Sequence, residues 1–233
     1  MSGGYIQLAA HDGGDFKAYL ALPEAPRGPV VVVLQEIFGV NRGIREVVED
    51  FAKAGYIAIA PDLFWRQERG VELDPGKEMD RERAMALMKG FDQDLAVRDA
   101  LTALAEAKLQ QGANGRCAAV GYCLGGKLSY LLAARSDLRA AVSYYGVGIQ
   151  GALDEARQIR GALLLHFAAD DNLCPSEAQK RIADAMQPLG EKVMLRTYSG
   201  VGHAFARRGG VTFHHQMAEQ ADSATLSFLE AHL

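Results

Sequence analysis

The feature that most constrains the fold is the run "VVVVL" at 30–34, in which apolar, mostly β-branched residues follow one another without interruption. A short run with no alternating polar residue is typical of a strand buried on both faces of a parallel sheet. Comparable runs recur along the chain and predict further strands at 56–60, 116–122, 140–146, 162–169 and 192–198. Parallel strands need crossover connections, so we expect helices between them.

Segments with helical periodicity separate these runs. In the first segment Ile44, Val47, Val48 and Phe51 recur at the spacing of one helix face, and Gly55 marks its end. The same criteria predict further helices at about 79–89, 92–110, 124–134 and 176–186, and a last one from about Phe213.

The opening of the chain has a different pattern. "YIQL" and "KAYLAL" are separated by the turn signal Asp12-Gly13-Gly14 and predict a hairpin-like pair of strands. No internal repeat, low-complexity tract or linker interrupts the sequence, so we expect one domain over residues 1–233. The expected fold class is α/β, with a mostly parallel sheet flanked by helices on both faces. Ligand sites in such sheets lie at the carboxyl ends of the strands.

Composition and charge exclude several classes of partner. The 233 residues are 49% hydrophobic, which is enough for one large core. The net charge is −4 without a block of like charges, so we expect neither nucleic acid nor a membrane surface as a partner. No secretory signal or membrane-spanning run is evident, and three cysteines without a CxxC pair argue against a disulfide framework or a zinc site. We therefore expect a cytoplasmic monomer without a metal.

The segment "VGYCLGG" at 120–126 places Cys123 between a predicted strand and a predicted helix. Gly121, Gly125 and Gly126 permit a sharp turn there. The pattern is that of the nucleophile elbow G-x-S-x-G, with Cys in place of Ser. A thiol at a helix N-terminus faces backbone N–H groups, which favour the thiolate. Crowding at the turn would explain the glycines but not the cysteine, so we predict that Cys123 is a nucleophile.

A nucleophile of this kind needs a base and an acid that orients the base, in the chain order nucleophile, acid, histidine. His203 lies in a Gly-rich loop after the strand predicted at 192–198 and is the candidate base. His166 lies within an apolar run and is expected to be a core histidine. The acid should follow the strand predicted at 162–169, but the local pattern does not distinguish Asp170 from Asp171.

Two other strand ends supply accessory candidates. In "LQEIFG" the N–H of Ile37 could pair with that of Leu124 as an oxyanion hole. Glu36 is either a solvated turn residue or a group that controls ionisation of the thiol. Tyr144 and Tyr145 end another strand; Tyr144 is a candidate for binding substrate, and core packing is the alternative.

Six segments together resemble the dienelactone hydrolase family, the cysteine-dependent carboxymethylenebutenolidases of the α/β-hydrolase superfamily. The resemblance extends over essentially the whole chain. The segments that carry it are "QEIFG" (35–39), "APDLF" (60–64), "GYCLGG" (121–126), "YYG" (144–146), "DNLCP" (171–175) and "GHAFAR" (202–207).

The resemblance implies an α/β-hydrolase fold and a specific set of roles. It matches Cys123 to the nucleophile, Asp171 to the acid and His203 to the base. It further implies that Ile37 and Leu124 donate to the oxyanion, that Glu36 gates formation of the thiolate, and that two arginines hold the carboxylate of the substrate, Arg81 and Arg207. The implied reaction opens the enol lactone dienelactone to maleylacetate without a cofactor.

The chain departs from the family pattern where substrate-facing aromatic residues are expected, because Met85 and Met88 stand there. Cys174 stands where valine is usual. Methionine adapts to irregular shapes, so the pocket could admit other substrates. The alternative is a broader carboxylesterase or thioesterase that acts on a different anionic or aryl ester. A non-catalytic lactone-binding protein and a thiol redox protein are two further readings; the second lacks a resolving cysteine nearby in sequence.

Overall fold

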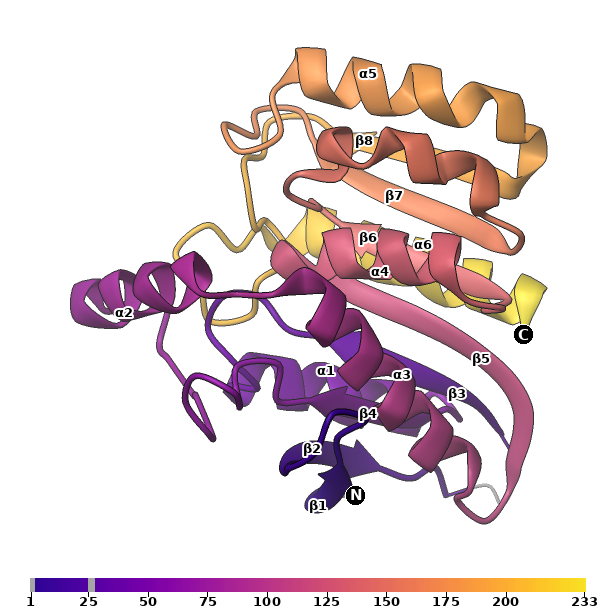
Figure 1. Cartoon of the computed structure of the whole chain (residues 1–233). Coiled ribbons are helices and arrows are strands. Elements are labelled where there is room, and N and C mark those ends of the chain that lie inside the picture. Colours follow the sequence, from indigo (N-terminus) through magenta and orange to yellow (C-terminus); the bar gives the residue numbers. More distant parts are fainter. Residues whose placement is uncertain (1–2, 25–27) are drawn as a thin grey trace. The chain divides into compact units, whose positions relative to one another are not determined.

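The computed structural model describes residues 3–24 and 28–233, which divide into two compact units, Met1–Cys117 and Ala118–Leu233 (Figure 1). The boundary falls inside strand β5 (Ala113–Tyr122). The single domain predicted from the sequence stays a prediction.

The first unit carries strands in the order β1-β2-β4-β3. The hairpin predicted at the start of the chain is the antiparallel pair β1 (Gly4–Ala9) and β2 (Asp15–Ala21). β2 pairs antiparallel with β4 (Ile57–Pro61), which pairs parallel with β3 (Gly28–Leu34). The run "VVVVL" lies in β3 and is wholly buried, as its sequence predicted.

Two helices of the first unit, α1 and α3, begin where polar side chains cap them. Asn41 accepts the N–H of Ile44 at 3.2 Å at the start of α1 (Arg42–Lys53). Asp92 accepts two backbone N–H groups at the start of α3 (Gln93–Lys108). Both helices contact β3 and β4. Between them lies α2 (Glu78–Lys89), most of whose residues are exposed.

The second unit carries the strand order β5-β6-β7-β8, with every neighbouring pair parallel. β6 (Ala140–Tyr144) and β7 (Ala162–Ala168) are buried along their whole length, and β8 (Val193–Tyr198) is mostly exposed. Helices α4 (Leu124–Arg135) and α6 (His215–His232) both contact β6 and β7. Figure 1 shows α4 in front of β6 and α6 behind it. α5 (Ser176–Met186) packs against short 3₁₀ helices.

The predicted strands and helices are confirmed, with shifts of a few residues at their ends. The strand predicted at 140–146 stops at Tyr144, because Tyr145 has a positive φ of 40° and leaves the extended conformation. Three 3₁₀ helices were not predicted: Ile149–Gly151, Leu153–Gln158 and Gln187–Lys192. No described helix is long and apolar enough to cross a membrane.

His166 is a buried core histidine, as predicted. It lies in β7, and its two ring nitrogens are 2.9 Å from the hydroxyl of Tyr198 and 3.0 Å from the hydroxyl of Thr225. Burial, assisted by the positive charge of Arg196, lowers the pKa of His166 from 6.5 to about 3. The imidazole is therefore neutral in the folded protein at physiological pH.

This neutral histidine should make stability depend on pH. Below pH 6.5 the unfolded chain protonates His166 while the folded protein does not, so the free energy of unfolding falls as the pH falls towards about 3. Between pH 7 and pH 5 the expected loss is about 2 kcal/mol. Urea unfolding of the wild type and of His166→Gln at both pH values measures this contribution. Parallel pH profiles for the two proteins would contradict the prediction.

Candidate active site

Cys123 joins β5 to α4 in a strained backbone conformation, with φ 54° and ψ −110°. Hydrogen bonds hold it there from two directions. Its N–H donates to the carbonyl of Tyr144 at 3.0 Å, and its own carbonyl accepts the N–H groups of Gly126 at 3.1 Å and Val147 at 3.2 Å. A non-glycine residue with this geometry is uncommon and costs about 1–3 kcal/mol, so the surroundings impose it.

The glycines around Cys123 are required by close contacts. A Cβ at Gly121 would lie 1.9 Å from the carbonyl oxygen of Gly125. A Cβ at Gly126 would lie 2.8 Å from the carbonyl oxygen of Tyr144 and from Cα of Gly146. Helix α4 can therefore approach the strand ends only because both positions lack a side chain.

His203 and Asp171 form a hydrogen-bonded pair in the same unit. Nδ1 of His203 lies 2.9 Å from Oδ2 of Asp171, although 32 residues separate them in the chain. Oδ1 of Asp171 accepts the N–H groups of Leu173 at 2.8 Å and Cys174 at 3.2 Å. Of the two candidates, Asp170 and Asp171, the second is therefore the partner of His203.

The surroundings of this pair favour an ionised acid and an available base. Burial raises the pKa of Asp171, but the hydrogen bond and charge of His203, together with two backbone N–H groups, outweigh it and leave the pKa below its ordinary value. In the part of the chain that the structure describes, Nε2 of His203 is buried and has no hydrogen-bond partner. The imidazole is thus oriented through Nδ1, and Nε2 is left to accept a proton.

Backbone strain is concentrated around these residues. Among the described residues, the non-glycine positions with positive φ are Cys123, Tyr145 and Ala204. Cys123 is the candidate nucleophile and Ala204 follows His203. The ring of Tyr145 meets the ring of His203 edge-on at 5.1 Å. Such strain clusters at functional sites, and Tyr145 therefore belongs with the site. The sequence placed it at a strand end without assigning it a role.

Tyr144 points away from this group. It is 1% exposed, and its hydroxyl lies 2.9 Å from Asp222 and 2.7 Å from Thr225, both on α6. Its ring stacks on that of Tyr122 at 4.6 Å. The hydroxyl is fully engaged inside the second unit, so the geometry favours the core-packing alternative over substrate binding.

Two other predicted residues lie in the second unit. Leu124 is the first residue of α4, and the first N–H groups of a helix have no partner within it. Arg207 is partly buried in the loop that carries His203, and its N–H donates to the carbonyl of Ala204 at 3.0 Å. Both therefore lie within four residues of a member of the candidate triad.

Cys174 is a poor candidate for the nucleophile. It is 1% exposed, and burial together with the negative charge of Asp171 raises its pKa to about 11. At neutral pH it is a thiol. Cys174 lies beside Asp171 and not at the elbow between β5 and α4.

The remaining predicted residues belong to the first unit. Glu36 is buried and Ile37 partly exposed, directly after β3. The side chain of Gln35 spans this turn, accepting the N–H of Leu63 at 3.1 Å and donating to the carbonyl of Glu36 at 3.3 Å. Their proximity to the nucleophile stays a prediction from the sequence.

Helix α2 carries the remaining substrate-binding candidates. Arg81 is exposed and donates to the carbonyl of Pro75 at 3.0 Å. Met85 is 57% exposed and Met88 is partly exposed. None of these side chains is needed for the core of the first unit, so they are available to contact a ligand.

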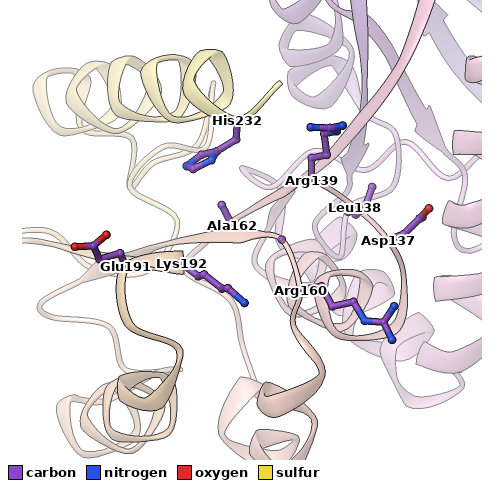
Figure 2. Close-up of a pocket in the computed structure, with 9 residues that line it drawn as sticks. Asp137, Leu138, Arg139, Arg160, Ala162, Glu191, Lys192 and His232 are labelled. Carbon is purple, nitrogen blue, oxygen red and sulfur yellow. The ribbon is translucent and has the colours of Figure 1, made fainter.

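A depression of about 640 Å³ lies elsewhere in the second unit (Figure 2). It is formed where β6, β7 and β8 begin, whereas Cys123 and Asp171 follow the carboxyl ends of strands. Its charged lining is of both signs: Asp137, Arg139, Arg160, Glu191 and Lys192. It is therefore distinct from the candidate active site. The described residues contain no cluster of His, Cys, Asp or Glu that could hold a metal ion.

Comparison with known proteins identifies close relatives. A model of the dienelactone hydrolase family matches residues 16–233. An Azospirillum brasilense protein provisionally named a carboxymethylenebutenolidase is 42% identical over 98% of both chains. The carboxymethylenebutenolidase of Pseudomonas sp. strain P51 is 36% identical over 97% of this chain and 94% of its own.

A solved structure supports the same relationship. A Klebsiella pneumoniae protein provisionally named a dienelactone hydrolase superposes with a TM-score of 0.85 at 26% identity, covering 97% of this chain and 96% of its own. The predicted α/β-hydrolase fold is confirmed.

The close contacts at the elbow predict a large effect for one methyl group. Gly121→Ala should lower the free energy of unfolding by at least about 2 kcal/mol, since its Cβ would meet the backbone of α4. Gly151→Ala is the matched control, because a Cβ there meets nothing within 4 Å. Thermal or urea unfolding of both variants measures the difference, and equal stability would refute the packing argument.

Proposed function

Because the chain belongs to the dienelactone hydrolase family, we propose that it opens dienelactone to maleylacetate through a thioester on Cys123. The observation that carries the proposal is the His203–Asp171 hydrogen bond of 2.9 Å, in the same unit as a cysteine held at a strained elbow. Those features support a nucleophile, a base and an acid that orients the base.

In the first step the thiolate of Cys123 attacks the lactone carbonyl carbon. A C–S bond forms, and the electron pair of the carbonyl moves to its oxygen. We assign the N–H groups of Leu124 and Ile37 to that oxyanion; the position of Leu124 at the start of α4 supports its part. We assign to Glu36 a role in gating ionisation of the thiol.

The choice of nucleophile suits the leaving group. From an ordinary alkyl ester the tetrahedral intermediate would mostly expel the thiolate again, and the attack would be unproductive. An enol lactone releases a resonance-stabilised enolate when its ring C–O bond breaks. Acylation of a cysteine can then go forward, and the enolate takes a proton from solvent water to become the ketone.

The second step hydrolyses the thioester. Nε2 of His203 takes a proton from water as the water oxygen attacks the acyl carbon, and the C–S bond breaks to restore Cys123. Asp171 stabilises the imidazolium that forms, and its lowered pKa supports that role. The protein supplies the nucleophile, base and oxyanion donors, so the proposal needs no cofactor.

Arg81 and Arg207 are proposed to hold the carboxylate of the substrate by charge-assisted hydrogen bonds. The alternative function keeps the same machinery and admits aryl esters or thioesters. The exposure of the flexible Met85 on α2 is the observation that favours it. We further propose a role in degrading aromatic compounds, as the family resemblance implies; a cytoplasmic location and a monomeric state stay predictions.

The nucleophile is tested by substitution and by trapping the intermediate. Cys123→Ala should lower kcat for cis- and trans-dienelactone and for p-nitrophenyl acetate by at least about 10⁴-fold, because no thioester can form. Cys174→Ala should keep most of the activity, since the Cys174 thiol is protonated at neutral pH. Mass spectrometry of His203→Ala mixed with substrate should find the acyl group on Cys123. Acylation of Cys174 instead would contradict the assignment.

The proposed roles of Arg81 and Arg207 are tested by comparing a substrate that carries a carboxylate with one that is uncharged. Arg207→Gln should raise KM for dienelactone about 10- to 100-fold, the loss expected for a charge-assisted hydrogen bond, and leave KM for uncharged p-nitrophenyl acetate within about twofold. Arg81→Gln should behave in the same way. Arg181→Gln, an exposed position on α5, removes the same charge and should change neither KM. Equal effects on both substrates would argue against carboxylate binding.

A further inference from the structure

We propose that Thr225 of α6 is a positioning residue for this active site and acts through a one-directional chain of buried hydrogen bonds. The chain runs through the second unit and joins Tyr198, His166, Thr225, Tyr144 and Asp222. The inference rests on the proposed function, because what Thr225 positions is the proposed triad.

The links of this chain are short and enclosed. They measure 2.9 Å from Tyr198 to His166, 3.0 Å from His166 to Thr225, 2.7 Å from Thr225 to Tyr144, and 2.9 Å from Tyr144 to Asp222. The first four residues are at most 6% exposed. The carboxylate of Asp222 at the end reaches solvent, where Arg208 lies 3.8 Å away.

The carboxylate of Asp222, at one end of this series of hydrogen bonds, determines which group donates in each of them. A carboxylate only accepts, so the hydroxyl of Tyr144 donates to Asp222. The oxygen of Tyr144 must then accept from Thr225, and the oxygen of Thr225 must accept from Nε2–H of His166. Nδ1 of His166 is left to accept from Tyr198. Burial raises the pKa of Tyr144 well above its ordinary value and that of Tyr198 to about 12, so both hydroxyls keep their protons.

The chain is tied to the site through two backbone carbonyls. The carbonyl of Tyr144 accepts the N–H of Cys123 at 3.0 Å, and the carbonyl of His166 accepts the N–H of Tyr145 at 2.8 Å. Tyr145 in turn meets the ring of His203. Two residues of this hydrogen-bond chain therefore bond two of the three strained positions of the site, one at the nucleophile and one beside the base.

Thr225 is the member on which the two halves of the chain depend. Its hydroxyl accepts from β7 and donates to β6, so it joins neighbouring strands from a helix that packs against both. Without this hydroxyl, Nε2–H of His166 and one lone pair of Tyr144 lose their partner in a buried place. The ends of β6 and β7 can then shift. The backbone at Tyr145 and Cys123 is then no longer held in its strained conformation.

The direction of the chain is tested by the tautomer of His166. The ¹⁵N chemical shifts of the imidazole distinguish the two neutral forms. At pH 7 we expect His166 to be protonated at Nε2 and to stay so in Thr225→Ser. A proton on Nδ1 would overturn the chain as described.

The positioning role is tested by three variants. Thr225→Val keeps the shape and removes the hydroxyl, and we expect kcat to fall about tenfold with KM within about twofold. Thr225→Ser restores the hydroxyl and should restore most of kcat. Leu229→Ala is the control for stability alone, because this buried residue of α6 is outside the chain and its truncation destabilises the same helix. It should lower the Tm and leave kcat unchanged.

Two outcomes would overturn the positioning role. One is a loss of kcat in Leu229→Ala that matches Thr225→Val at equal loss of Tm. The other is a failure of Thr225→Ser to recover activity. If the wild type hydrolyses p-nitrophenyl acetate but not dienelactone, the lactone proposal fails, and the same comparison made with the aryl ester still decides the role of Thr225.

A spectroscopic measurement decides the role without any substrate. The proton on Nδ1 of His203, bonded to Asp171, should give a downfield ¹H resonance. We expect this resonance to shift or broaden in Thr225→Val and to remain in Thr225→Ser and Leu229→Ala. An unchanged resonance in Thr225→Val would refute the proposal even if the protein hydrolyses neither substrate.

Discussion

The hydrogen bond from the N–H of Cys123 to the carbonyl of Tyr144 is the interaction on which the site depends. It joins the end of β5 to the end of β6 at the point where the chain must reverse into α4. It also holds a non-glycine residue at positive φ, so the side chain lies at the strand ends and at the start of a helix. The glycines at 121 and 126 allow α4 to come close enough for that arrangement.

Strain at Cys123, Tyr145 and Ala204 costs about 1–3 kcal/mol at each position and must be offset elsewhere. In the second unit the compensation is local. β6 and β7 are buried from end to end, and buried side chains of α4 and α6 pack against them. The polar groups inside this core are arranged so that an uncharged histidine, two tyrosines and a threonine satisfy one another. Of the strained residues, Cys123 and Tyr145 directly follow the buried ends of β5 and β6.

In the pair of His203 and Asp171, the polar groups also satisfy one another by hydrogen bonds. One oxygen of the carboxylate receives two backbone N–H groups and the other receives the imidazole, so the acid is fully hydrogen-bonded and stays ionised. Orientation of the ring through Nδ1 leaves Nε2 for chemistry. Membership of the dienelactone hydrolase family is consistent with this geometry, and the proposed alternative of a broader esterase rests on the exposed Met85 of α2.

Local pattern was sufficient to predict the strands and the α-helices, because burial of one helix face gives a period of 3.6 and burial of both strand faces gives an uninterrupted apolar run. The elbow was legible because a sharp turn between strand and helix requires glycines, and the loop position of His203 because Gly-rich sequence follows a predicted strand. The choice between Asp170 and Asp171 was not legible from the local pattern, since two adjacent aspartates have the same local surroundings. The family resemblance matched Asp171, and this is the residue that bonds a histidine 32 residues later. The direction of the Tyr144 side chain was equally hidden, because its partner Thr225 lies 81 residues away on a helix with no local signal for it. Local pattern was enough to place the strands, the α-helices and the residue types at their ends, but not the three 3₁₀ helices. Only the tertiary structure decided which of those residues meet, because hydrogen bonds between strand ends depend on distances that local pattern does not encode.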